Sequence, residues 1–74
     1  MNMYERIRNL REDRDLTQSE VAELLHCTQV CYSNYETGKR EIPTVALEIL
    51  ADFYDVSVDY LLGRTNVKKP YPKK

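Results

Sequence analysis

The chain has 74 residues, of which 42% are apolar, and it carries a formal net charge of −1. A chain of this length forms one domain with a small core, which excludes a second, ligand-sensing domain. No apolar run approaches the roughly 20 residues that cross a bilayer, and the charged start differs from a signal peptide, so we expect a cytoplasmic protein with no membrane partner.

The first expected element is an amphipathic helix near the N-terminus. Met3, Ile7 and Leu10 recur at the spacing of one helical face, while arginines and acids occupy the other face. Residues 13–16 are expected to form a loop, because the first three are charged. Leu16 then takes the apolar position that often precedes a helix cap.

Two short helices separated by a tight turn are predicted in residues 17–40. Thr17 and Glu20 match a capping box, in which each side chain satisfies a free backbone N–H of the first helical turn. A second cap, Thr28, opens the next helix, and Gly38 permits the left-handed backbone that ends it. The apolar positions of the two helices are Val21, Leu24, Leu25, Tyr32 and Tyr35.

Two further helices are expected after a polar connection that ends at Pro43 and Thr44. Asp55 ends the longer helix with a left-handed backbone, which aspartate tolerates better than most residues. Ser57 caps a short last helix, which Gly63 closes. The expected buried positions of the longer helix are Ala46, Ile49, Leu50 and Phe53, and the last helix is expected to run through Leu61 and Leu62. No sustained alternation predicts a strand, so the expected fold class is all-α, compact, with five helices.

Charge is distributed unevenly along the chain. Residues 1–40 carry a net charge of −1, residues 41–62 a net charge of −5, and residues 64–74 a net charge of +5. A nucleic-acid surface needs basic side chains on one face rather than a high total charge. Lys39, Arg40 and the C-terminal tail can supply such a face, and we expect the acidic block to point away from it.

The C-terminal tail, residues 65–74, combines four lysines and two prolines with little apolar material. Such a composition is typical of disorder. We therefore place the folded domain at residues 3–64 and a basic, disordered tail after it. The tail is either a solubilising end or a basic arm that contacts phosphates or a neighbouring subunit.

Cys27 and Cys31 lie four positions apart, beside His26. A structural disulfide is not expected in a reducing cytosol, and a zinc site needs four ligands where this cluster offers three. We therefore predict no metal and no cofactor, and treat both thiols as small apolar groups around the turn. A redox switch is the alternative, since oxidation here would distort the adjacent helix.

These segments together resemble the helix-turn-helix domain of the phage repressor, Cro and Xre regulators. The first part of the resemblance comprises Leu16-Thr17-Gln18, Val21-Ala22, Leu24, Tyr32-Ser33, Tyr35-Glu36, Gly38-Lys39 and Pro43. The second part comprises Leu50-Ala51-Asp52 and Val56-Ser57-Val58-Asp59-Tyr60-Leu61-Leu62-Gly63. The resemblance implies a lambda-repressor-like fold with its motif at residues 17–36. It also implies sequence-specific binding of double-stranded DNA by a small transcriptional regulator of the repressor type.

In such domains the second helix of the motif enters the major groove, and the first lies against the DNA backbone. The recognition helix is then residues 29–37, and its outward side chains are expected to contact bases. These are Gln29, Val30, Ser33 and Asn34. Amides can pair with adenine and valine can touch a thymine methyl, which favours an A·T-containing half-site. Phosphate contacts are expected from Gln18, Thr28, Lys39 and Arg40.

The resemblance implies two structural features around the motif. The glutamate at the place of Glu36 often pairs with an arginine of the first helix in this family, and Arg11 is the matching residue. We expect this pair also to aim the guanidinium toward the DNA backbone. Glycine is the commonest family residue where His26 stands, because the turn needs a left-handed backbone, which histidine visits more readily than most residues. We therefore expect the turn to form at some cost in stability.

Specific binding by this class usually takes two copies, so we expect a homodimer on a palindromic operator with half-sites about one helical turn apart. Tyr54, Tyr60 and Leu61 are either the dimer contact or part of the core. The alternative function is an antitoxin-like or antirepressor-binding protein-interaction module on the same fold. No small-molecule ligand is indicated. We do not expect an enzyme, because the lone histidine has no positioned acid and nucleophile beside it.

Overall fold

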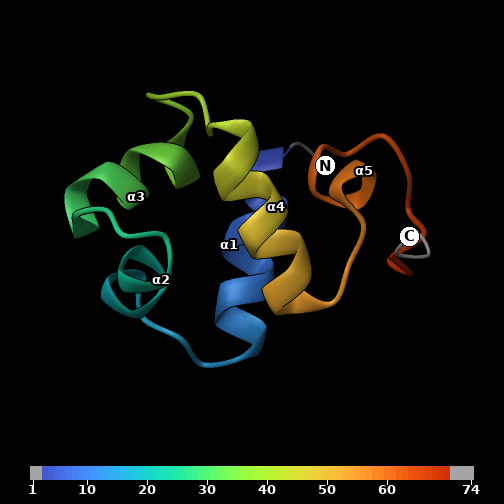
Figure 1. Cartoon of the computed structure of the whole chain (residues 1–74), viewed down its shortest axis with the longest axis horizontal. Helices are drawn as coiled ribbons and strands as arrows, with labels where there is room; N and C mark the ends of the chain where they lie inside the picture. Colours follow the sequence, from blue (N-terminus) through green and yellow to red (C-terminus); the bar gives the residue numbers. More distant parts are fainter. Residues whose placement is uncertain (1–2, 71–74) are drawn as a thin grey trace.

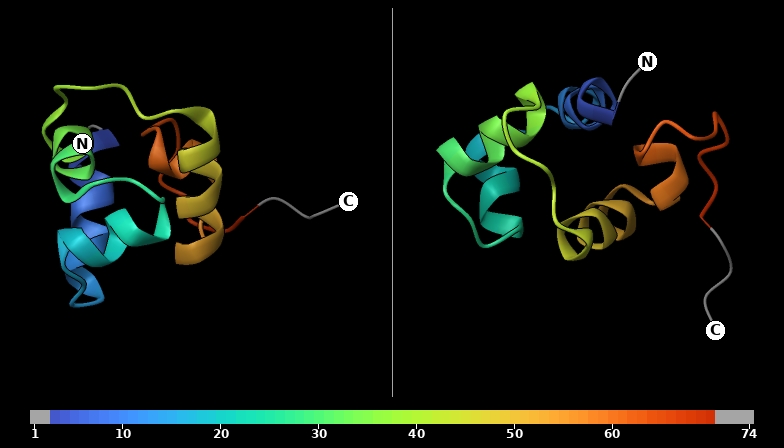
Figure 2. Two further views of the ribbon diagram at one scale, coloured as in Figure 1. Left: turned by 60° about the vertical axis from the view of Figure 1, so that its left-hand side comes forward. Right: turned by 90° about the horizontal axis from the view of Figure 1, so that it is seen from above.

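The computed structural model describes residues 3–70, which contain five helices and no strand. The helices are α1 (Met3–Asp13), α2 (Gln18–Leu24), α3 (Gln29–Thr37), α4 (Thr44–Tyr54) and α5 (Val58–Leu61). Helix α2 packs on α3, α1 packs on both α3 and α5, and α4 packs on α5 (Figure 1). Figure 2 shows α2 and α3 at one end of the molecule and α5 at the other, with α1 and α4 between them. The predicted all-α, five-helix fold is confirmed.

The core takes one large, fully buried side chain from every helix. These side chains are Ile7, Val21, Tyr32, Leu50 and Leu61, in the order of the helices. Burying a side chain of this size contributes about 1.5–3 kcal/mol, so no helix can detach without a loss that matters to a small domain. The predicted stripe of α1 is confirmed at Ile7 and Leu10, while the side chain of Met3 lies outside the described residues.

The buried stripe of α4 is wider than predicted and differs at its end. Ala46 and Leu50 are buried as predicted and Ile49 is half-buried, but Phe53 is 39% exposed and Tyr54 is only 3% exposed. Leu47 and Ala51 complete the buried side. Because neighbouring positions of a helix differ by about 100°, the apolar residues of α4 allow two overlapping stripes, and packing against the other helices selects one.

Two residues that were candidates for a dimer contact belong to the core. Tyr54 is 3% exposed and Leu61 is fully buried within this single chain. Burial raises the pKa of the Tyr54 hydroxyl to about 12. Tyr60 is half-buried and packs against the core. The core interpretation of these residues is therefore the correct one.

The helix starts follow the predicted caps. Glu20 N donates to Thr17 Oγ1 at 3.1 Å, and Thr17 N donates to Glu20 Oε1 at 2.9 Å, which completes the capping box. Thr28 Oγ1 accepts from Cys31 N at 3.1 Å at the start of α3. Gly38, with φ of 80°, ends α3 as predicted. The caps at both ends keep the connection between α2 and α3 short.

Among residues 3–70, three non-glycine residues have a left-handed backbone: Asp15 with φ of 54°, His26 with φ of 56° and Asp55 with φ of 57°. The left-handed conformation of His26 and Asp55 was predicted, and that of Asp15 was not. His26 lies exposed in the turn between α2 and α3. Its ring therefore gains no burial that would offset the strain of its backbone.

We expect His26→Gly to stabilise the fold by about 1 kcal/mol. A left-handed backbone costs a non-glycine residue roughly 1–2 kcal/mol, which glycine avoids. Glycine also makes the unfolded chain more flexible, and this cancels part of the gain in stability. Urea unfolding at neutral pH measures the change. Gly38→Ala is the matched control and should lose stability. A less stable His26→Gly would mean that the histidine ring makes stabilising contacts.

The start of the C-terminal tail is bound to the domain by Arg6, a side chain that is 7% exposed. Arg6 Nη1 donates to the carbonyl oxygens of Tyr60 at 3.0 Å and Thr65 at 2.7 Å. Its Nη2 donates to Asn66 Oδ1 at 2.7 Å. The guanidinium carbon also lies 4.2 Å from the centre of the Tyr60 ring. This one arginine thus joins α1, α5 and the tail.

A second contact extends along the tail to Lys68. Ser57 N donates to the carbonyl oxygen of Lys68 at 2.9 Å, and Lys68 Nζ lies 5.8 Å from the centre of the Tyr60 ring. Residues 65–68 thus contact the domain, because a buried guanidinium needs acceptors and this segment supplies them. The disorder of the tail stays a prediction. The end of the predicted tail, residues 71–74, lies outside the described residues.

Ending the chain at Gly63 is expected to lower the free energy of unfolding by roughly 1–3 kcal/mol, since Arg6 loses two acceptors. Thermal unfolding measures the loss. The control is Val67→Ala, because Val67 is 63% exposed and its replacement should leave stability unchanged. Equal stability of the shortened and full chains would show that these hydrogen bonds add nothing to the fold.

Candidate nucleic-acid interface

One edge of the molecule is formed by α3, the start of α2 and the loop that follows α3, and we call it the α3 face. Helix α3 buries Tyr32, Tyr35 and Glu36 on its inner side. Its outer side presents Gln29 and Val30, and Val30 is 66% exposed. The remaining predicted contact residues of this face are exposed or half-buried: Gln18, Thr28, Ser33, Asn34, Lys39 and Arg40.

The first turns of α2 and α3 are joined by a pair of glutamines. Gln29 Nε2 donates to Gln18 Oε1 at 2.6 Å, and Gln18 Nε2 donates to Glu36 Oε1 at 3.2 Å. The Gln29 amide is thereby held in one orientation through a chain of hydrogen bonds that reaches the buried Glu36. The sequence predicts separate tasks for the two glutamines and does not indicate their contact. Their shared place at the first position of each helix of the motif is the signal that could have found it.

The Arg11–Glu36 pair that the resemblance implies is present in the structure. Arg11 Nε donates to Glu36 Oε2 at 2.7 Å, and Arg11 Nη2 donates to Glu36 Oε1 at 3.2 Å. Arg11 Nη1 donates to the carbonyl oxygen of Leu16 at 2.8 Å. The side chains of Arg11 and Glu36 are 13% and 3% exposed. The guanidinium is engaged inside the fold by all three of its nitrogens and holds α3 on α1. That it also points toward the DNA backbone stays a prediction.

The electrostatics of this pair explain how an acid can lie behind a helix that is predicted to face DNA. Burial acts to raise the pKa of the Glu36 carboxyl, but hydrogen bonds led by those from Arg11 outweigh it and hold the pKa below its ordinary value. The hydrogen bond with Glu36 in turn raises the pKa of Arg11. Both groups are therefore ionised at neutral pH, and Arg11 offsets the negative charge of Glu36.

The loop after α3 folds back over the helix and carries the basic residues of the face. Arg40 N donates to the carbonyl oxygen of Asn34 at 3.3 Å. Thr37 Oγ1 donates to the carbonyl oxygen of Ser33 at 3.2 Å, a contact that the sequence analysis did not predict. The neighbouring Lys39 is exposed to solvent in this loop. Positive charge is thus placed at the C-terminal end of α3.

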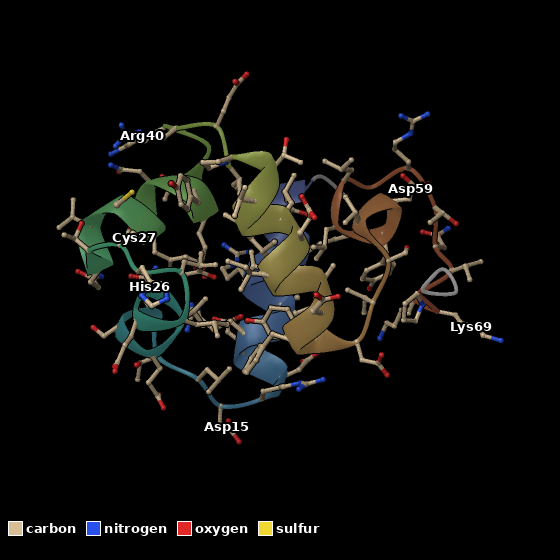
Figure 3. All side chains as sticks on the ribbon, viewed as in Figure 1. Asp15, His26, Cys27, Arg40, Asp59 and Lys69 are labelled. Carbon is tan, nitrogen blue, oxygen red and sulfur yellow. The ribbon has the colours of Figure 1, made fainter. Side chains whose placement is uncertain are left out.

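The described part of the tail lies apart from this charge, whereas the sequence predicted that the tail could share one face with Lys39 and Arg40. Arg40 lies at the α3 end of the molecule, while Lys69 and Asp59 lie at the α5 end (Figure 3). Asp59, the last acidic residue of the acidic block, therefore lies apart from Arg40 and the α3 face.

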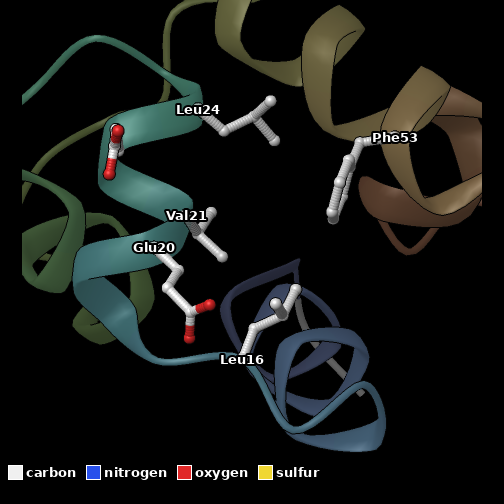
Figure 4. Close-up of a pocket in the computed structure, with 6 residues that line it drawn as sticks. Leu16, Glu20, Val21, Leu24 and Phe53 are labelled. Atoms are coloured by element: carbon white, nitrogen blue, oxygen red, sulfur yellow. The ribbon is translucent and has the colours of Figure 1, made fainter.

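A cleft of about 350 Å³ opens between α2 and α4. It is lined by Leu16, Glu20, Val21, Glu23, Leu24 and Phe53 (Figure 4). Glu20 and Glu23 at its edge carry negative charge that repels phosphate, so the cleft differs chemically from the α3 face.

None of the described helices is long and apolar enough to span a membrane.

Residues 5–62 match the profile of a helix-turn-helix domain family. The chain belongs to this family. It is 42% identical over 69 residues to the uncharacterised HTH-type transcriptional regulator YobD, and 39% identical over 69 residues to the HTH-type transcriptional regulator ImmR, both of Bacillus subtilis. The matches cover 92% and 93% of this chain but 62% and 54% of the relatives. The chain thus spans less than two thirds of the length of these curated relatives.

A solved structure with a similar fold is that of the P22 c2 repressor protein in complex with synthetic operator 9T. The TM-score is 0.77 and the identity 29%, over 84% of this chain and 94% of that chain. The cryptic phage CTXphi transcriptional repressor RstR of Vibrio cholerae is 35% identical over 71 residues, which cover 93% of this chain and 64% of that protein. The predicted resemblance to phage repressors is therefore confirmed.

Proposed function

We propose that this helix-turn-helix chain is a transcriptional regulator of the repressor type that binds double-stranded DNA sequence-specifically, with α3 in the major groove. The observation that carries the proposal is the α3 face. Its outer side is polar and exposed, its inner side is anchored by Tyr32 and the Arg11–Glu36 pair, and a basic loop follows it. The operator in the similar P22 c2 repressor structure supports the same assignment.

The outward side chains of α3 would read bases. Gln29, held by Gln18, can offer its free carbonyl oxygen and its second amide hydrogen to the edge of an adenine. Val30, which is 66% exposed, can contact a thymine methyl group. Ser33 and Asn34 lie one turn further along α3 and can reach the next base pairs. An A·T-containing half-site follows from these groups.

Phosphate contacts would flank the recognition helix on both sides. Gln18 opens α2 and Thr28 caps α3, and the backbone N–H groups at a helix start favour an anion. Lys39 and Arg40 would bind the DNA backbone at the other end of α3. These contacts supply salt-dependent affinity without sequence information. A regulator of this kind needs access to DNA, so we place it in the cytoplasm. We also propose that the folded domain starts at residue 3 and includes the bound segment to residue 68.

Specific binding requires more base pairs than one α3 can reach, so we propose a homodimer on a palindromic operator. Two copies would set their α3 helices in successive major grooves, about one helical turn apart. Tyr54 and Leu61 are buried in the core of the single chain, so they do not supply the contact between copies. Sedimentation with and without operator DNA measures whether the pairing needs DNA.

Selection of bound sequences from random double-stranded DNA, at a stated salt concentration, tests the proposal. We expect a palindrome with an A·T-containing half-site. The matched pair of variants is Asn34→Ala on the α3 face and Glu48→Ala on the exposed side of α4: only the first should change the selected sequence. No enrichment at low salt would contradict specific DNA binding.

A further inference from the structure

The turn that leads into α3 brings two thiols together at the edge of the α3 face. Cys27 directly precedes the cap Thr28, and Cys31 lies in the first turn of α3, where its N–H binds Thr28 Oγ1 at 3.1 Å. Both cysteines are free thiols and half-buried. Each thiol alters the pKa of the other, as groups at close range do. Both side chains also pack, partly buried, against the same core, and only three residues separate them.

The two thiols have unequal surroundings. Arg40 Nη1 lies 4.0 Å from Cys31 Sγ, and the first turn of α3 adds the positive partial charge of a helix N-terminus. The neighbouring Tyr35 hydroxyl lowers the pKa of Cys31, and Cys27 and Arg40 add to this effect. Burial raises the pKa of Cys27, and the charge of Cys31 raises it further. Cys31 is thus the better nucleophile, and Cys27 stays protonated beside it.

We propose that Cys31 and Cys27 form a peroxide-sensitive thiol pair that controls the α3 face. The Cys31 thiolate attacks one oxygen of hydrogen peroxide, the O–O bond breaks, and the departing hydroxide takes up a proton to become water. Cys31 is left as a sulfenic acid. Cys27 sulfur then attacks the Cys31 sulfur, the S–O bond breaks, and a second water leaves with the Cys27 proton. The two thiols lose two electrons and two protons, which the peroxide accepts.

The disulfide would act directly on the residues proposed to read DNA, so this part of the inference rests on the proposed function. The ring that it closes contains Thr28, Gln29 and Val30. Pulling Cys31 toward Cys27 displaces the first turn of α3, and it removes the thiol that Arg40 contacts. A base contact and a phosphate contact are disturbed together, whereas a reducing cytosol restores both thiols.

The test treats the reduced protein with hydrogen peroxide and follows thiol titration, intact mass and DNA affinity, with and without later addition of dithiothreitol. We expect loss of both thiols and of two hydrogen atoms from a monomeric chain. Affinity for the selected operator should fall by roughly tenfold or more, as for loss of one base contact, and dithiothreitol should restore it. Far-ultraviolet circular dichroism checks that each variant below is folded.

Two single variants separate the roles of the sulfur atoms. Cys27→Ser should stop at a sulfenic acid that dimedone traps, while Cys31→Ser should react no faster than free cysteine. Equal reactivity of the two variants, or wild-type thiols as slow as free cysteine, would overturn the thiol pair. A disulfide that leaves DNA affinity unchanged would overturn its control of binding. If the reduced protein selects no DNA while the disulfide still forms, specific DNA binding and its regulation by the thiols are both contradicted, but the reaction of the thiols with peroxide is confirmed.

Discussion

Glu36→Gln is expected to destabilise the folded chain by about 3 kcal/mol, a large share of the stability of a small domain. The carboxylate accepts three hydrogen bonds, two from Arg11 and one from Gln18. The amide keeps the shape of the side chain but leaves the Arg11 guanidinium, 13% exposed, without a counter-charge. Denaturant unfolding followed by circular dichroism measures the loss.

A double-mutant cycle isolates the pair from the other contacts of the two side chains. The double variant Arg11→Met, Glu36→Gln should lose less stability than the two single variants lose together. The difference should be about 1 kcal/mol or more, as for other residues in direct contact. Arg8→Met with Glu48→Gln is the control, because both side chains are exposed, and it should be nearly neutral. Additive losses for Arg11 and Glu36 would show that the ion pair does not couple α1 to α3.

The same pair makes stability depend on pH in a defined direction. The pKa of Glu36 is lower in the folded chain than its ordinary value of 4.5. A group with a depressed folded pKa contributes stability above its unfolded pKa and loses that contribution as the pH falls through the folded pKa. The difference in stability between the wild-type chain and Glu36→Gln should therefore be constant near neutral pH and should shrink below pH 4.5.

Gln29→Ala is expected to weaken binding to the selected operator by roughly tenfold to a hundredfold, the cost of one lost bidentate base contact. Binding to a scrambled sequence at the same salt should change little, because the side chain is assigned to a base and not to a phosphate. Fluorescence anisotropy on both DNA duplexes measures the ratio of the two affinities. Equal weakening on both duplexes would show that Gln29 serves the DNA backbone.

Two further variants test the roles of Gln18 and Arg40, which lie near Gln29 on the α3 face. Gln18→Ala should couple with Gln29→Ala in a double-mutant cycle, since the two amides lie 2.6 Å apart and Gln18 sets the orientation of Gln29. Arg40→Ala should instead weaken both duplexes alike and lower the slope of affinity against salt by about one. Additive effects of the two glutamines would assign them to separate contacts.

The helix boundaries were predictable because their determinants are local. A capping box such as Thr17 with Glu20 is complete within four residues, and Gly38 ends α3 through its own backbone freedom. The left-handed backbone of Asp55 follows from the same local rule. The outward residues of α3 were predictable too, since one buried face leaves the other exposed. Their contacts with DNA stay predictions.

Several features that the sequence did not predict join residues far apart in the chain. Arg6 binds Thr65 and Asn66, which composition alone assigned to a disordered tail. The rotation of α4 exposes Phe53 and buries Tyr54, although both lie on apolar stripes of the helix. Nothing within one helix distinguishes such alternatives, because each depends on what the rest of the fold places opposite it.

The α3 face likewise combines features that local sequence determines with features that only tertiary packing decides. By itself the sequence determined that two capped helices flank a left-handed turn at His26, because hydrogen bonds and dihedral preferences within a few residues decide those features. Only the tertiary structure decided that Gln18 holds Gln29 and that Cys31 meets Arg40. Such contacts depend on side chains brought within hydrogen-bond range, and it is the packing of α2 against α3 and the return of the following loop that set those distances.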